Sequence, residues 1–119
     1  MNQVGLIGNL AKDPELKQLP GTDGRMVLEF ALAWSERYKT AEGTWDERSQ
    51  FIDCAVYGPY GEKLERYMKK GDRVGVEGRI KYRAWKSDDG ATHSKHSLEV
   101  YHVDFLSAKD DTQELDSDE

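Results

Sequence analysis

Hydrophobic side chains occupy every second position of residues 28–34, which is the period of a β-strand. The alternating set consists of Leu28, Phe30, Leu32 and Trp34. A strand with this pattern buries one face, so we expect all four side chains, Trp34 included, in a core. Four other short apolar segments are bounded by Gly, Pro or polar turns. They predict strands at about residues 3–10, 51–57, 72–86 and 96–106.

Only residues 61–69 have the pattern of a helix. Leu64, Tyr67 and Met68 share one side, and the lysines and the glycine that follow are typical of a helix C-terminus. Residues 36–50 are polar and are expected to form a hairpin loop. The order of elements favours an all-β chain with one short helix. A five-stranded OB-fold Greek-key barrel has this order, with the helix between strands 3 and 4.

The net charge of −6 is unevenly distributed along the 119 residues. Residues 110–119 hold six of the 23 acidic residues and no base, so residues 1–109 hold 17 residues of each sign. The acidity therefore belongs to a tail and does not argue against an anionic ligand for the rest of the chain. We expect one folded domain over residues 1–108 and an acidic, disordered tail over residues 109–119.

Features that would direct the chain to a membrane or to secretion are not expected. No apolar run approaches the roughly 20 residues that span a bilayer, and the first residues lack a basic segment followed by an apolar one. The single cysteine, Cys54, cannot form an internal disulfide and fits a reducing compartment. We therefore expect a cytoplasmic protein that does not insert into a membrane.

The segment at residues 51–57 alternates between two kinds of side chain. Its apolar face, the natural core face, consists of Ile52, Cys54 and Val56. Its other face consists of Phe51, Asp53, Ala55 and Tyr57. Two aromatic rings on a face away from the core either pack under the helix or a loop, or provide a platform on which unpaired bases stack.

The segment at residues 72–86 favours the stacking interpretation. Its even positions carry Val74, Val76, Ile80 and Tyr82. Its odd positions carry Arg73, Glu77, Arg79, Lys81, Arg83 and Trp85, and Lys86 follows. Such a basic row is either a solvated edge that deters aggregation or the wall of a groove that follows a phosphate backbone. Trp85 favours the groove, because a solvated edge does not require an indole ring.

The polar loop again interleaves cations with aromatic rings. These residues are Arg37, Tyr38, Lys39, Trp45 and Arg48. Trp45 either belongs to the same surface or only pins the loop.

In their order and spacing, these segments resemble the bacterial-type single-stranded DNA-binding proteins from residue 2 to about residue 106. The matching segments are GLIGNL at residues 5–10, KDPEL at 12–16, FALA at 30–33, EGTW at 42–45, FIDC at 51–54, YMKKGDRVGVEGR at 67–79 and YRAW at 82–85. No single piece is specific, whereas the ordered set is highly specific.

The resemblance implies an OB-fold that assembles as a homotetramer, with the first strand at a dimer interface. It also implies that the protein binds and protects single-stranded DNA, independently of sequence, in DNA replication, recombination and repair. A protein with this role is expected to be associated with the nucleoid. The base-stacking positions of the family fall on Tyr38, Phe51, Tyr57 and Trp85. From the basic residues themselves, we expect phosphate contacts at Lys39, Arg48, Arg73, Arg79, Lys81, Arg83 and Lys86.

Several features depart from the family pattern. Tyr38 and Phe51 stand where tryptophan is common, and Asp53 puts a negative charge on the expected binding face. The tail ends in Asp118-Glu119 without the hydrophobic pair by which family tails dock partner proteins, so such docking is not expected. The tail is either a solubilising segment or a competitor with DNA for the basic groove.

Catalysis is not expected. Neither Cys54 nor the histidines His93, His96 and His102 have the spacing of zinc ligands, and no phosphate-binding glycine loop is present, so we expect no metal and no cofactor. The alternative function is an OB-fold protein-interaction or primosome-type module with weak nucleic-acid binding. An aromatic ring at all four stacking positions favours DNA binding over this alternative.

Overall fold

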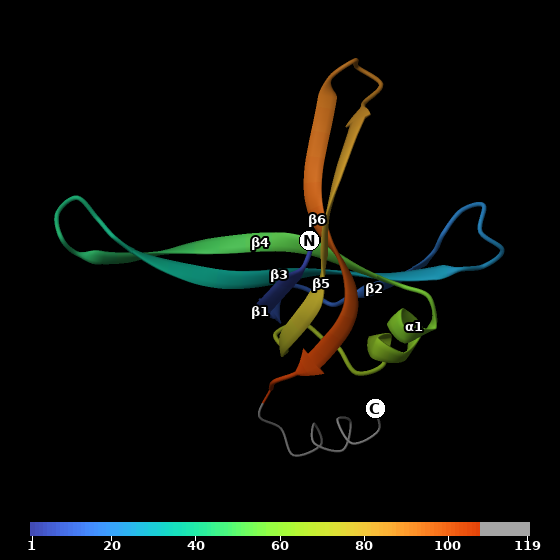
Figure 1. The fold of residues 1–119 in the computed structure, drawn as a ribbon, viewed down its shortest axis with the longest axis horizontal. Coiled ribbons are helices and arrows are strands. Elements are labelled where there is room, and N and C mark those ends of the chain that lie inside the picture. The colour runs from blue at the N-terminus through green and yellow to red at the C-terminus, as the bar shows by residue number, and fades with distance from the viewer. Residues whose placement is uncertain (108–119) are drawn as a thin grey trace.

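The computed structural model describes residues 1–107. Its elements are β1 (Val4–Leu10), β2 (Glu15–Gln18), β3 (Met26–Lys39), β4 (Trp45–Tyr57), α1 (Pro59–Glu65), β5 (Arg73–Lys86) and β6 (Thr92–Phe105), drawn in Figure 1. The expected domain end at residue 108 and the expected tail at residues 109–119 lie outside the described residues.

Five strands close into a barrel in the order β1-β5-β6-β4-β3. β1 is antiparallel to β5 and also pairs with β3 at Asn9 and Leu10, which closes the circle. β4 and β6 run parallel to each other. The expected five-stranded barrel, with its helix between the third and fourth barrel strands, is therefore confirmed. β2 is an additional short strand on the side of β3 away from β4, in a segment for which the sequence predicts no strand.

The barrel interior is formed by the alternating apolar residues of the strands. The cluster contains Leu10, Leu28, Phe30, Leu32, Cys54, Val56, Leu64, Met68, Val74, Val76, Leu98, Val100 and Val103. Trp34 was expected here, and that prediction is wrong. Trp34 continues the row of Leu32 but pairs with Gln50, where β3 and β4 leave the barrel, and is only half-buried.

The β3–β4 hairpin continues as an arm well beyond the barrel (Figure 1). The two strands stay paired out to Lys39 and Trp45, so the loop is residues 40–44 rather than the expected 36–50. Polar side chains are compatible with strands here because both faces of the arm meet solvent and neither needs a hydrophobic period.

The β5–β6 hairpin forms a second arm, paired out to Lys86 and Thr92 (Figure 1). Ile80 and Tyr82 follow the buried row of β5 but are 42% and 61% exposed. The reason is that the even-numbered row leaves the core once β5 enters the arm. The side chain of Asn2 caps this position, since it accepts a hydrogen bond from the Ile80 N–H (2.8 Å) and donates one to the Ile80 carbonyl (2.9 Å).

α1 is shorter than the expected helix at residues 61–69 and begins at Pro59, directly after Gly58 with φ 85°. It packs against β2, β3 and β4, and Leu64 enters the core. The N–H of Val103 in β6 donates a hydrogen bond to the hydroxyl of Tyr60 (2.9 Å). This bond fixes the helix against the barrel.

Candidate nucleic-acid interface

The outer surface of the sheet carries the odd-numbered residues among 29–33 of β3, 51–57 of β4, 93–99 of β6 and 79–85 of β5. Residues that pair directly across a ladder point to the same face. One such row is Ala31, Asp53, Ser97 and Lys81, and the next is Glu29, Ala55, Glu99 and Arg79. This face borders a groove of about 650 Å³, which is also lined by Tyr57 and Arg83.

Phe51 and Tyr57 lie on this outer face of β4, on the side predicted from the alternation. Phe51 is 64% exposed, and Tyr57 is exposed at the groove, with the guanidinium carbon of Arg25 lying 5.8 Å from its ring centroid. Both rings are accessible, so the interpretation in which they pack under the helix or a loop is wrong.

Trp85 lies on the same face of the β5–β6 arm, paired with His93. The imidazole of His93 stacks on the indole, with centroids 5.5 Å apart, and the guanidinium carbon of Arg83 lies 4.3 Å from the indole centroid. The hydroxyl of Ser87 lies 3.0 Å from Nε2 of His93. The indole is 37% exposed, so part of its surface remains available for a further aromatic partner.

Charges of both signs line the groove. Its cations are Lys12, Lys17, Lys81, Arg83 and Lys95. Its carboxylates are Glu15, Glu29, Asp53 and Glu99. Several of these groups pair with one another across the strands.

Glu99 joins two cations of β5. Its Oε1 accepts a hydrogen bond from Nε of Arg79 (3.0 Å) and lies 3.0 Å from Nη2 of Arg79 and 3.5 Å from Nζ of Lys81. Desolvation by itself raises the pKa of Glu99, but the hydrogen bond and charge of Arg79, with a contribution from Lys81, outweigh it, so the pKa is lowered. Glu99 is therefore ionised near neutral pH.

Two further lysines of the groove are paired. Nζ of Lys17 lies 2.8 Å from Oε1 of Glu29 and 3.6 Å from Oε1 of Glu15. The hydrogen bond and charge of Glu29 raise the pKa of Lys17. Nζ of Lys95 forms an ion pair with Oδ2 of Asp53, which links β6 to β4.

The β3–β4 arm carries two more rings, each beside an arginine. The guanidinium carbon of Arg48 lies 4.8 Å from the centroid of Tyr38, and that of Arg37 lies 5.1 Å from the centroid of Trp45. Tyr38 pairs with Asp46 and Trp45 with Lys39, so the alternation puts Tyr38 and Trp45 on opposite faces of the arm. Trp45, which was left open from the sequence, shares the face of Phe51.

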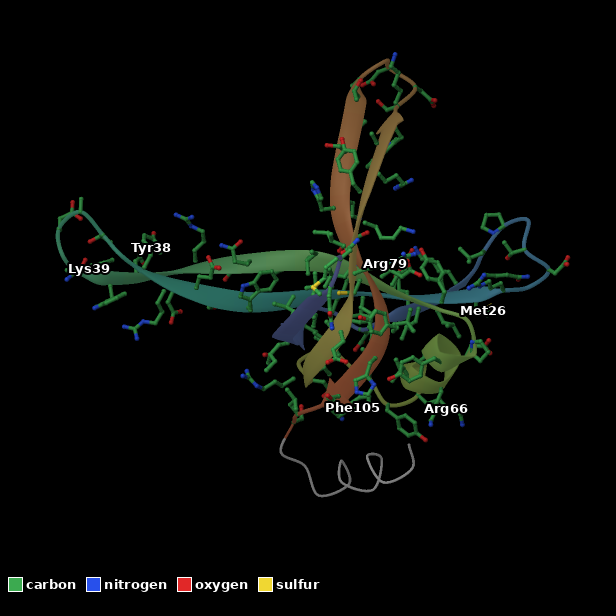
Figure 2. All side chains as sticks on the ribbon, viewed as in Figure 1. Met26, Tyr38, Lys39, Arg66, Arg79 and Phe105 are labelled. Carbon is green, nitrogen blue, oxygen red and sulfur yellow. The ribbon has the colours of Figure 1, made fainter. Side chains whose placement is uncertain are left out.

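The expected site residues are not all in one place. Tyr57, Lys81 and Arg83 line the groove, and Phe51, Arg79 and Trp85 extend the same face. Three others, Tyr38, Lys39 and Arg48, lie on the β3–β4 arm; Figure 2 shows Tyr38 and Lys39 toward its tip, away from Arg79. Two more lie apart: Arg73 begins β5, at the opposite end from Trp85, and Lys86 pairs with Thr92 on the other face of its arm from Trp85.

Several residues that line the groove or contact the exposed rings were not expected from the sequence. They are Lys12, Lys17, Arg25, His93 and Lys95. His93 and Lys95 lie in the first part of β6, which begins at Thr92 rather than at the expected residue 96, so the alternation was not applied to them. The other three lie in β2 or in turns, where no period marks them.

Within residues 1–107, no group of three or more His, Cys, Asp and Glu side chains is arranged to hold a metal ion. The same residues contain no helix of the length and apolarity needed to cross a membrane. Cys54 is buried in the core, and desolvation raises its pKa to about 12.

Comparison with known proteins gives a consistent result along the described part of the chain. The model of the single-strand binding protein family matches residues 1–106. Single-stranded DNA-binding protein 3 of Clostridium acetobutylicum is 42% identical over 106 residues, which are 89% of this chain and 71% of that protein. The single-stranded DNA-binding protein of Helicobacter pylori is 33% identical over 116 residues, or 98% of this chain. The chain spans 64% of the length of this relative and 62% of the Helicobacter hepaticus protein.

Two solved structures are similar in fold. A Plasmodium falciparum SSB complex with ssDNA has a TM-score of 0.80 and 25% identity, over 90% of this chain and 96% of that one. A deletion mutant of the single-stranded DNA binding protein from Thermus aquaticus has a TM-score of 0.77 and 28% identity, over 92% of this chain and 52% of that one.

Proposed function

The chain belongs to the single-strand binding protein family, and on that premise we propose that it binds and protects single-stranded DNA, without sequence preference, in DNA replication, recombination and repair. One observation carries the proposal. The exposed rings Phe51, Tyr57 and Trp85 share one face of the sheet with the cations Lys81 and Arg83, and Tyr57 and both cations line the groove on that face.

The rings are proposed to stack with bases. Every base has a π-face, so stacking tolerates any sequence and contributes about 1–3 kcal/mol per base. Phe51, Tyr57 and Trp85 form the platform on the sheet. Tyr38 lies on the other face of the β3–β4 arm, so stacking on it requires a strand that crosses this arm. A duplex is excluded from this mode, because its bases are already stacked on one another.

The cations are proposed to contact phosphates. Lys81 and Arg83 in the groove, with Arg79 beside them, are the best placed of the expected set, and Lys12 and Lys95 join them. Lys39, Arg48, Arg73 and Lys86 lie farther from the groove, so their contacts require a strand that continues along the arms or around the barrel. Such contacts release counterions, so affinity is expected to fall as salt rises.

A homotetramer is proposed as the working assembly. β1 supports this, because Val4–Gly8 of its ladder pairs with β5 only, among the described residues. Ile7 of this strand is 52% exposed. A second copy could cover both the strand edge and this side chain. Light scattering of the full chain is expected to give four times the mass of 13.6 kDa, whereas a monomer would contradict the assembly.

The protein is proposed to act by binding alone, in the cytoplasm, through residues 1–108 and with no metal or cofactor. The protein-interaction alternative is not favoured, because a module of that kind does not need exposed rings on the same face as a groove that is lined by several cations.

The proposal is tested by fluorescence anisotropy with an oligo(dT) and with a duplex of equal length. We expect binding to the single strand that weakens with salt, and much weaker binding to the duplex. Equal binding to both nucleic acids, or binding to neither, would overturn the proposal.

A further inference from the structure

The cations of the groove are largely occupied by carboxylates of the same chain. Lys95 pairs with Asp53, Glu99 joins both Arg79 and Lys81, and Lys17 lies between Glu29 and Glu15. Among the described residues, Lys12 and Arg83 are the lining cations outside these ion pairs.

The pairs are placed where a ligand would meet them. Asp53 and Glu99 project from β4 and β6 onto the same outer face as Phe51 and Trp85. The side chains of Lys95 and Asp53 are about half exposed, at 46% and 50%. These ion pairs therefore belong to the binding surface itself and are accessible to an incoming strand.

We infer that the carboxylates of Asp53 and Glu99 are built-in counterions that phosphates of the bound strand must displace, and that they thereby limit the affinity and the salt dependence of this groove. The inference rests on the proposed function, since it requires that single-stranded DNA enters the groove.

The physical basis is the release of counterions. A free lysine that meets a phosphate releases a cation from the DNA, which steepens the fall of affinity with salt by about 0.7 in logarithmic slope per contact on a single strand. A lysine already paired with a carboxylate must first give up that partner. The displaced carboxylate then lies beside the phosphates and retains a cation from solution. Both effects weaken binding and reduce the salt slope.

The experiment measures oligo(dT) affinity of the full chain between about 50 and 200 mM salt by anisotropy. Asp53→Asn and Glu99→Gln are each expected to bind roughly two- to fivefold more tightly at the low salt concentration. This change in affinity corresponds to the free energy of one exposed ion pair, which no longer has to be broken. Asp53→Asn is expected to steepen the salt slope by about 0.7, because one lysine becomes available to a phosphate.

A matched control separates this effect from a general change of charge. Asp104→Asn also removes one negative charge, from a carboxylate whose Oδ1 lies 2.8 Å from Nε2 of His102, but Asp104 does not line the groove. Its affinity and slope are expected to stay near those of the unmodified chain. Groove variants that behave like Asp104→Asn, or bind more weakly, would overturn the inference.

A double-mutant cycle with Lys95→Ala tests the pair itself. In the Lys95→Ala background, Asp53→Asn is expected to leave the salt slope unchanged, because the cation that it would free is missing. An equal steepening in both backgrounds would mean that Asp53 acts by repelling phosphates and not by occupying Lys95. Binding by none of the proteins would overturn the proposed function, whereas binding with unaltered slopes would overturn the counterion inference alone.

Discussion

The imidazole of His93 stacks on the indole of Trp85, with the ring centroids 5.5 Å apart and 22° between the planes. The two residues pair directly across β5 and β6, so the ladder brings the rings together. Arg83, on the same face, holds its guanidinium beside the same indole. The indole is therefore fixed before a ligand arrives, which lowers the conformational entropy lost when a base stacks on it.

Replacing Trp85 by alanine is expected to weaken oligo(dT) binding by about 1–3 kcal/mol, because one stacking partner is lost. The fold should persist, since the ring lies outside the core. Tyr67→Ala is the control, because Tyr67 is also 37% exposed but lies after α1 and away from the groove. Anisotropy titration measures both variants. Equal affinity of Trp85→Ala and Tyr67→Ala would count against stacking on Trp85.

Gly78→Ala is expected to destabilise the barrel by about 1–3 kcal/mol or more, because the added methyl group overlaps β6. A Cβ at this position would lie 2.1 Å from the carbonyl oxygen of Glu99. It would also lie 2.9 Å from Cα of Val100, beside the bulge that leaves Tyr101 without a partner on β5.

Gly5→Ala in β1 is the matched control for Gly78→Ala, since a Cβ there meets nothing within 4 Å. Thermal unfolding of both variants is the measurement. If Gly78→Ala melts at as high a temperature as Gly5→Ala, β6 does not approach Gly78 closely enough to exclude a Cβ atom, and the prediction is contradicted.

The ion pairs of Glu99 predict a pH dependence of stability. Its pKa in the folded state is lowered from the usual 4.5, so the pairs stabilise the fold above that value and are lost as the pH falls through the lowered pKa. Glu99→Gln is expected to be less stable near neutral pH by under about 1 kcal/mol, as for exposed pairs. The difference should vanish in acid. Urea unfolding of Glu99→Gln and of the unmodified chain, near neutral pH and in acid, measures the difference in stability. A difference that grows on acidification would contradict the stabilising role of the Glu99 ion pairs.

Cys54 is expected to react slowly with iodoacetamide near neutral pH. Its side chain is buried in the core, and desolvation, helped by the charge of Asp53, raises its pKa to about 12, so very little thiolate is present. The chain unfolded in concentrated urea provides the comparison and should be modified rapidly. Mass spectrometry follows both reactions; equally fast modification of the folded chain would contradict the burial of Cys54.

The barrel strands were predictable because each has one buried face. The period of two in Leu28, Phe30 and Leu32 follows from burial, and the same reasoning put Phe51 and Tyr57 on the outer face. The arms were not predictable in the same way. Residues 36–39 and 45–50 meet solvent on both faces, so no hydrophobic period distinguishes strands from a loop.

The ion pairs of the groove depend on contacts that no local pattern encodes. Lys95 reaches Asp53 because β6 runs parallel to β4, a pairing between segments more than 40 residues apart in the chain. The position of the register shift at Tyr101 likewise depends on the closed barrel. Sequence alternation therefore identifies the face that carries the site. Which charged side chains on that face are paired with one another can be determined only from the tertiary structure.

The fluorescence emission of Trp85 alone tests most directly where the single strand lies on the protein. The chain has three tryptophans, so Trp34→Phe combined with Trp45→Phe leaves Trp85 as the only one. Titration of this variant with poly(dT) is expected to quench its emission strongly until the binding sites are saturated, because bases stack on the indole. Binding detected by anisotropy with no change in the emission of Trp85 would contradict the central claim that the outer face of the sheet is where the strand lies.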